Sequence, residues 1–138
     1  YNGSPLGSFR VQVGGLGMYE TLVFPNPMRK THRVTRIYFH LLSSIAGGHL
    51  RITDLNGRTV LRLDLAQPGV VQTNAPGVPP GSIGTGTHQD STTWNYVEWD
   101  GRDQAGGAVS NGVYLYELQI KGRDGKTQRK RDKVVVMR

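Results

Sequence analysis

The sequence predicts an all-β fold, an antiparallel β-sandwich of about seven strands of the immunoglobulin-like type. Three observations predict it. Nineteen glycines and seven prolines divide the 138 residues into short pieces. Between these turn signals lie short runs rich in β-branched and aromatic residues, which is typical of strands. No window of helical length carries apolar residues at i, i+3 and i+4 without a glycine or proline interrupting it.

Composition narrows the class of protein. A length of 138 residues suits a single domain, and apolar residues make up 36% of the chain. No apolar run approaches the roughly 20 residues that span a bilayer. The absence of cysteine excludes disulfides, thiolate metal sites and a cysteine nucleophile.

The first part of the chain divides into a Gly-rich arm and two predicted strands. Residues 1–19 form the arm, in which "FRVQV" (9–13) can extend as a strand. The segment "ETLVFPNP" (20–27) predicts a strand that ends at a Pro-Asn-Pro corner, because proline cannot donate to the ladder. The alternation in "RVTRIYFHLL" (33–42) places Ile37, Phe39 and Leu41 on one face.

The middle of the chain predicts a hairpin followed by an insertion. In residues 47–65, Leu50 and Ile52 face one way and "DLNG" supplies a tight turn between two strands. Residues 66–93 are rich in Gly, Pro, Ser and Thr and are too long for an ordinary connection. We expect a functional loop or a flexible insertion there.

The last three predicted strands are residues 94–100, 112–120 and 133–138. Alternation places Tyr114 and Tyr116 on one face of their strand, and we expect them to pack in the core beside Trp99. A sugar-stacking role for the two tyrosines is the alternative.

Asp100 and Asp103 lie in the Gly-rich stretch "WDGRDQAGG" (99–107), where they could serve a turn or a site. Aspartate side chains accept hydrogen bonds from nearby backbone N–H groups in turns, which is the favoured interpretation. The alternative is a calcium site that Asp54 completes by folding, since calcium takes oxygen ligands from loops. No catalytic constellation is found, so we expect no enzyme activity and no cofactor.

The net charge is +7, and much of the excess lies in "KGRDGKTQRKRDK" (121–133). Such a tract can attract an anionic surface polymer, or it can form a solvated hairpin whose cations protect strand edges. We do not expect nucleic acid to bind, because no stacking platform accompanies the charge.

Five motifs in order give the sequence a family resemblance: "VFPNP", "TRIYFHL", "LRITDLNGRTVLRL", "WDGRDQAGGAVSNGVYLYEL" and "KVVVMR". Residues 20–138, apart from the insertion at 66–93, resemble the Ig-like domain of the flagellar hook-capping protein and the C-terminal sorting domains of type IX secretion. The resemblance implies a non-catalytic sandwich of secreted or surface proteins, extracellular or on the bacterial cell surface. In the sorting group an outer-membrane translocon reads the domain, which implies a sorting strand at Lys133, Val134, Val135, Val136, Met137 and Arg138.

The resemblance leaves two functions open, with protein partners in both. The first is a module that sorts, anchors or assembles a bacterial surface protein, with a secretion translocon as partner. The second is a structural subunit of an extracellular filament or sheath, in which copies of the chain bind one another. Here the arm adds a strand to a neighbour through Phe9, Val11 and Val13. The short arm and the long insertion suggest a free-standing subunit or a fragment. A carbohydrate-binding or calcium-dependent adhesion module is a third hypothesis.

Overall fold

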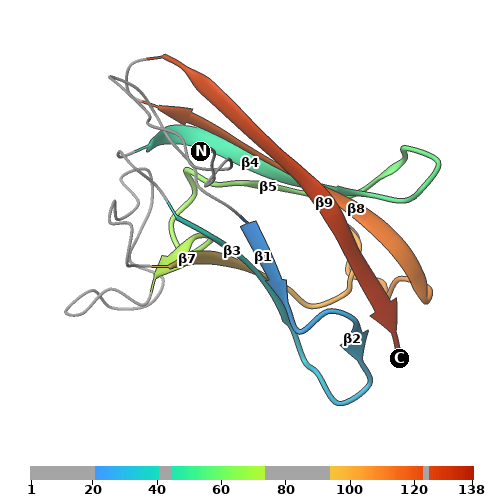
Figure 1. The fold of residues 1–138 in the computed structure, drawn as a ribbon. Helices are drawn as coiled ribbons and strands as arrows, with labels where there is room; N and C mark the ends of the chain where they lie inside the picture. Colours follow the sequence, from blue (N-terminus) through green and yellow to red (C-terminus); the bar gives the residue numbers. More distant parts are fainter. Residues whose placement is uncertain (1–20, 41–44, 74–93, 123–124) are drawn as a thin grey trace, which may run out of the picture.

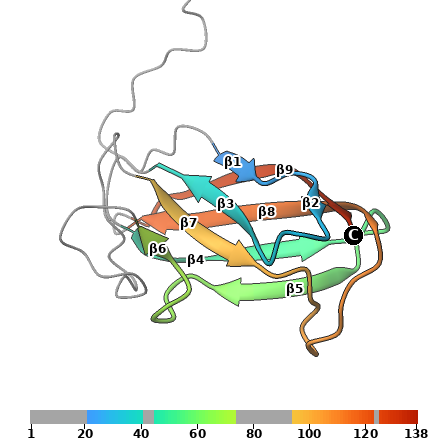
Figure 2. The same ribbon diagram turned by 90° about the horizontal axis from the view of Figure 1, so that it is seen from below.

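The structure, a computed structural model, describes residues 21–40, 45–73, 94–122 and 125–138. In these ranges the chain forms two β-sheets that pack face to face (Figures 1 and 2). One sheet has the order β1-β3-β7-β6 and the other β2-β9-β8-β4-β5. The strands are β1 (Thr21–Phe24), β2 (Met28–Arg29), β3 (Thr35–Phe39), β4 (Ile45–Thr53), β5 (Thr59–Asp64), β6 (Gln72–Thr73), β7 (Asn95–Trp99), β8 (Gly112–Gly122) and β9 (Thr127–Met137).

The predicted β-sandwich is confirmed, with two differences in its strands. The described residues contain nine strands rather than about seven, because β2 and β6 are two-residue pieces too short to show alternation. The pairing of β2 with β9 is parallel, so the five-stranded sheet is not purely antiparallel. No helix in the described part of the chain is long and apolar enough to cross a membrane.

Strand β8 lies inside the five-stranded sheet and organises it. It pairs antiparallel with β4 on one side, where Leu118 lies opposite Leu50. On the other side it pairs antiparallel with β9, where Leu118 lies opposite Lys130. Successive side chains of a strand point to opposite faces, so one row of β8 faces the other sheet and the alternate row faces outward.

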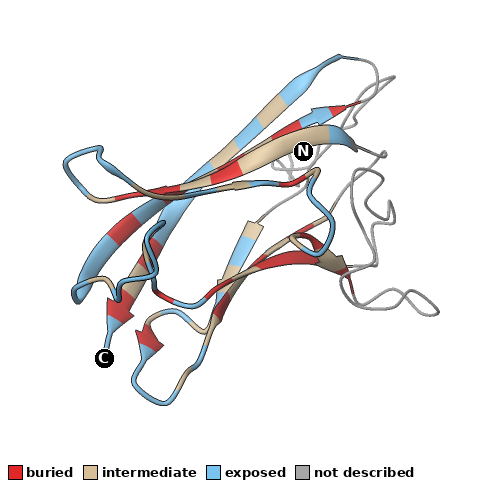
Figure 3. Cartoon of the chain, turned by 180° about the vertical axis from the view of Figure 1, so that it is seen from behind, coloured by how far each residue is buried: buried red, intermediate tan, exposed pale blue. Residues whose placement is uncertain are grey.

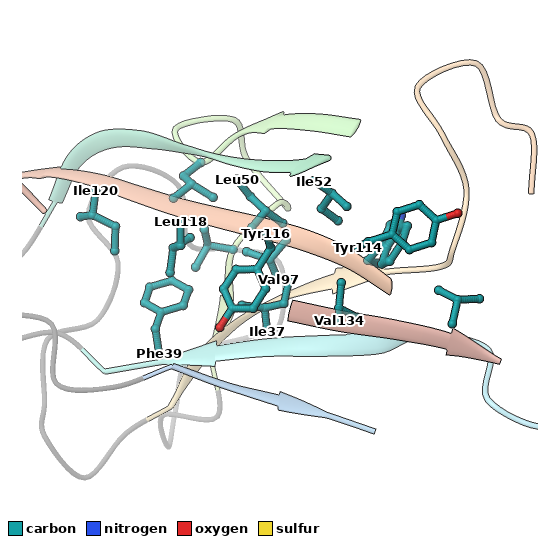
Figure 4. Close-up of a cluster of buried hydrophobic side chains, with 14 residues drawn as sticks. Ile37, Phe39, Leu50, Ile52, Val97, Tyr114, Tyr116, Leu118, Ile120 and Val134 are labelled. Atoms are coloured by element: carbon teal, nitrogen blue, oxygen red, sulfur yellow. The ribbon is translucent and has the colours of Figure 1, made fainter. Parts of the chain in front are cut away.

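The inward rows of both sheets form a single core (Figure 4). Ile37 and Phe39 from β3 and Val97 from β7 pack with the inward residues of β4 and β8. Along β3 and β8, buried residues alternate with intermediate or exposed ones (Figure 3). The core residues are Ile37, Phe39, Leu50, Ile52, Leu65, Val71, Val97, Trp99, Tyr114, Tyr116, Leu118, Ile120, Val134 and Val136.

Two segment boundaries differ from the sequence-based expectation. The start of the expected insertion belongs to the sandwich, because Val71 is buried and β6 pairs with β7. The last strand begins at Thr127 rather than Lys133, so the basic tract is the end of one long hairpin formed by β8 and β9. The sequence pattern did not indicate a strand from Thr127 onward, because a strand whose solvent-facing side is polar shows little apolar alternation.

Three expectations lie outside the described residues. They are the arm at 1–19 with Phe9, Val11 and Val13, the remainder of the insertion at 74–93, and the facing of Leu41.

Truncating one inward and one outward side chain of β8 tests which face of the strand is buried. Leu118→Ala removes a fully buried side chain, so we expect the free energy of unfolding to fall by about 2–5 kcal/mol. Leu115→Ala is the matched control, because Leu115 lies on the same strand but is 43% exposed, and its cost should be roughly 0.5 kcal/mol. Urea denaturation measures both, and equal losses would contradict the assigned facing.

Candidate interaction surfaces

In two loops at one end of the sandwich, aspartate side chains accept hydrogen bonds from backbone N–H groups of the same loop. Asp54 Oδ1 accepts hydrogen bonds from the backbone N–H groups of Asn56 and Arg58, both at 2.9 Å. Asp103 Oδ1 likewise accepts from the N–H groups of Ala105 and Gly107, at 3.0 and 2.8 Å. These bonds fix the loop conformations, as aspartate side chains do in turns.

Asp100 makes the same kind of bond. Its Oδ1 accepts from the backbone N–H of Arg102 at 3.1 Å, and its other oxygen lies 3.7 Å from the Arg102 guanidinium. The favoured interpretation of this stretch as turn chemistry agrees with these bonds.

The three aspartates named for calcium are not brought together as a set. Asp54 and Asp103 line one open hollow of about 500 Å³ with Tyr114, and Asp100 is not part of its lining. Within the described residues, no group of three His, Asp or Glu side chains could hold a metal ion.

Gln104 covers the outer edge of β5. Its backbone N–H donates to the carbonyl of Val60 at 2.9 Å, and its side-chain Oε1 accepts from the N–H of Arg62 at 2.9 Å. One residue thus satisfies a donor and an acceptor of an edge strand, in the way a neighbouring strand would. This contact protects the β5 edge against pairing with another chain.

The residues of the implied sorting strand form the end of β9. Val134 and Val136 are buried, whereas Lys133 and Met137 are exposed. The Asn26 side chain holds the edge beside them, since its Oδ1 accepts from the N–H of Val135 at 2.9 Å.

Residues of the loop between β7 and β8 hold Arg138, which directly follows β9. Asn111 bonds the backbone of Arg138 twice, at 2.8 and 2.9 Å, and the Arg138 guanidinium donates to the carbonyls of Gly101 and Val109. Gly101 has a φ of 77°, and a Cβ there would lie 2.8 Å from the guanidinium. The positive φ therefore favours glycine at this position, whereas the flexible arginine could move to admit a Cβ.

The outer face of the four-stranded sheet is rich in aromatic residues. Tyr38 contacts Trp94 and Tyr96, with ring centroids 5.8 and 5.4 Å apart. Arg36 lies over the Tyr96 ring at 4.5 Å and pairs with Glu98 at 3.0 Å. On β1, at the edge of this sheet, Leu22 is 51% exposed and Phe24 is 64% exposed.

Trp99, Tyr114 and Tyr116 lie in the core rather than on a surface. Trp99 and Tyr114 meet edge to face with centroids 5.8 Å apart. The Tyr116 hydroxyl bonds to the Thr21 hydroxyl at 2.6 Å and so links β8 to β1 of the opposite sheet. Burial raises the pKa of Tyr116, the Thr21 bond opposes this rise, and Asp132 adds to it. A sugar-stacking role for the two tyrosines does not fit their burial.

The outer face of the five-stranded sheet carries a cluster that sequence reasoning missed. The Glu117 carboxylate accepts a hydrogen bond from Arg131 at 2.8 Å and lies 3.6 Å from His49 Nε2 and 3.9 Å from Arg51. Alternation in "GVYLYELQI" does place Glu117 opposite the core row. The partners come from β4 and β9, and the strand order that joins them cannot be read from the sequence.

Comparisons with known proteins place the fold. No family model and no curated protein matches the chain. Among solved structures, dimeric latent PorU from Porphyromonas gingivalis matches 91% of this chain at 20% identity, with a TM-score of 0.57. This chain spans only 10% of PorU.

Two further solved structures are similar with lower TM-scores. FlgD from Pseudomonas aeruginosa matches 74% of this chain and 61% of its own at 22% identity, with a TM-score of 0.47. CopC from Methylosinus trichosporium OB3b matches 86% of this chain and 94% of its own at 10% identity, with a TM-score of 0.43. At 20% identity, the comparison with PorU shows that this chain shares a fold with a segment of PorU.

The Glu117 cluster predicts a pH-dependent stability. Burial alone would raise the pKa of the Glu117 carboxyl group, but Arg131, together with His49 and Arg51, lowers it below its usual value of 4.5. Glu117→Gln should therefore reduce the free energy of unfolding at neutral pH by about 1 kcal/mol. The difference from the wild type should close as pH falls below 4.5 through the lowered folded-state pKa, because the wild-type carboxylate then takes up a proton.

Urea denaturation between pH 7 and pH 2 measures this difference. Asp132→Asn, which removes one carboxylate from an exposed position of β9, is the control and should cost less at neutral pH. A Glu117→Gln deficit that does not change across this range would contradict the predicted linkage.

Proposed function

We propose that the chain is a non-enzymatic extracellular module that sorts or anchors a bacterial surface protein, with a secretion translocon as its protein partner. The observation that carries this proposal is the arrangement of residues 133–138. Val134 and Val136 anchor the strand in the core, while Lys133 and Met137 remain accessible to a partner. A folded domain can thus present these two side chains without unfolding.

The sequence resemblance to sorting domains and the fold shared with part of PorU support the proposal. The shared segment is a tenth of PorU, so this fold also occurs within a much longer chain. A sorting module attached to cargo has the same organisation.

A reporter fused before residue 1 tests the sorting role in a bacterium with type IX secretion. Surface exposure is measured by protease accessibility on intact cells, beside a strain that lacks the translocon. We expect exposure of the reporter only where the translocon is present. The double variant Lys133→Ala/Met137→Ala should reduce it to background, because both accessible side chains of the terminal strand are lost.

The matched control is Lys121→Ala/Leu115→Ala, which removes one lysine and one apolar side chain from exposed positions of β8. It should leave surface exposure unchanged. Equal exposure with and without the translocon would overturn the sorting role, and equal losses in both double variants would overturn the role of the terminal strand.

Assembly into a filament is the second candidate, and the edge strand β1 favours it. Among the described strands β1 pairs only with β3, and it exposes Leu22 and Phe24. Strand addition by the arm of another copy would use such an edge, whereas Gln104 covers the β5 edge. Electron microscopy of the purified chain tests this function separately from the reporter experiment. Fibres that form from the full chain and disappear when residues 1–18 are deleted would favour assembly over sorting.

A further inference from the structure

The outer face of the five-stranded sheet concentrates positive charge across four strands. Glu117 on β8 lies opposite Arg51 on β4 and Arg131 on β9, and Arg51 lies opposite Arg62 on β5. Neighbouring strands are about 4.8 Å apart, so these four side chains form a row about 14 Å long. We call this set, with Lys121, Arg129 and Lys133 from the same face, the cationic face.

Glu117 orders part of the cationic face but cannot neutralise it. Its side chain is only 12% exposed, and its oxygens are shared by Arg131, Arg51 and His49. The Arg131 and Arg51 side chains remain 67% and 42% exposed. They are therefore held in place by one carboxylate while their outer surfaces stay accessible to a ligand.

The neighbouring arginines contact side chains other than carboxylates. Arg129 donates to the amide oxygen of Gln119 at 2.9 Å, and an Arg62 Nη atom lies 3.5 Å from His49 Nδ1. The alternating facings place six cationic side chains on this surface against two carboxylates. The cations are Arg51, Arg62, Lys121, Arg129, Arg131 and Lys133, and the carboxylates are Asp64 and Glu117. The charges of β5 (Arg62 and Asp64) and of β8 (Lys121 and Glu117) cancel, so the surplus of positive charge comes from Arg51 on β4 and from Arg129, Arg131 and Lys133 on β9.

The cationic face contains a hollow. It measures about 500 Å³, and its lining combines three cations with two carboxylates and three other side chains. These are Arg51, Arg131 and Lys133, then Glu117 and Asp132, and then Thr53, Tyr116 and the exposed Leu115. An exposed apolar side chain beside three cations suits the ring of a charged sugar, whose faces are apolar and whose substituents are anionic. Guanidinium groups match carboxylate and sulfate oxygens through paired hydrogen bonds.

The outward rows of β4, β8 and β9 lack the stacking platform that nucleic acids use. Single-stranded nucleic acids combine a cationic groove with aromatic side chains on which bases stack. On β8 the outward residues are Val113, Leu115, Glu117 and Gln119, while Tyr114 and Tyr116 face the core. The outward positions of β4 and β9 beside them carry no Phe, Tyr or Trp.

We propose that the cationic face binds an acidic polysaccharide, laid across the strands with one charged sugar in the hollow beside Leu115. This inference goes beyond the proposed protein partner and does not depend on it. Lys133 belongs both to this face and to the terminal strand, so the binding test changes Arg62 and Arg129, which lie outside residues 133–138.

Binding is tested on the full chain with fluorescently labelled heparin as the sulfated probe and polygalacturonate as the carboxylated probe. The variant is Arg62→Gln/Arg129→Gln, because neither residue bonds Glu117 and both are exposed. We expect its affinity for the preferred probe to fall roughly tenfold at physiological salt, since two anion contacts are lost. Which probe binds more tightly identifies the anionic group.

The matched control is Arg33→Gln/Arg58→Gln, which lowers the net charge equally at exposed positions outside the cationic face. It should keep its affinity within about twofold of the wild type. Thermal melts of both variants check that folding is intact.

Three outcomes would overturn the proposal. Equal weakening in both double variants would mean that binding follows net charge rather than this face. Tighter binding of a DNA oligonucleotide than of either polysaccharide would assign the face to nucleic acid. No binding of either polysaccharide at physiological salt would remove the site, while leaving the sorting role to be judged by reporter exposure.

Discussion

The burial of every second side chain of β8 is the constraint on which the rest of the structure depends. Tyr116, Leu118 and Ile120 enter the core from the middle of a five-stranded sheet. Because a strand alternates strictly, this burial fixes Glu117 on the opposite side. The registers with β4 and β9 then bring Arg51 and Arg131 beside it. The core and the charged surface are two consequences of one alternation.

The core aromatics also position the loops and the edge. The indole N–H of Trp99 donates to the carbonyl of Arg102 at 2.9 Å, and the Tyr114 hydroxyl donates to the carbonyl of Ser110 at 2.6 Å. Both bonds tie the loop between β7 and β8 to buried rings. The hydroxyl of Tyr116 reaches Thr21 on the opposite sheet in the same manner. The loop between β7 and β8 and the edge strand β1 are thus held by polar groups of aromatic side chains whose rings are buried in the core.

Alternation made the fold class and much of the core predictable from the sequence, as Ile37, Phe39, Leu50 and Ile52 illustrate. Contacts made by single side chains across long separations were not predictable. Asn26 bonds the strand that ends more than a hundred residues later, and Gln104 covers β5. The aspartate turns could be predicted because their hydrogen bonds are local. The Glu117 cluster could not, since it depends on which strands are neighbours.

The most direct test of this strand arrangement is hydrogen exchange of backbone amides followed by NMR. A strand inside a sheet has all its N–H groups bonded, whereas an edge strand has alternate groups bonded. Because Val135 directs its N–H toward Asn26, the N–H groups of Arg129 and Arg131 also point away from β8. We predict slow exchange at every residue of β8 from Tyr114 to Ile120, and alternating slow and fast exchange along β9 from Arg129 to Asp132. Alternating exchange along β8 would contradict its central position, and with it the core and the cationic face.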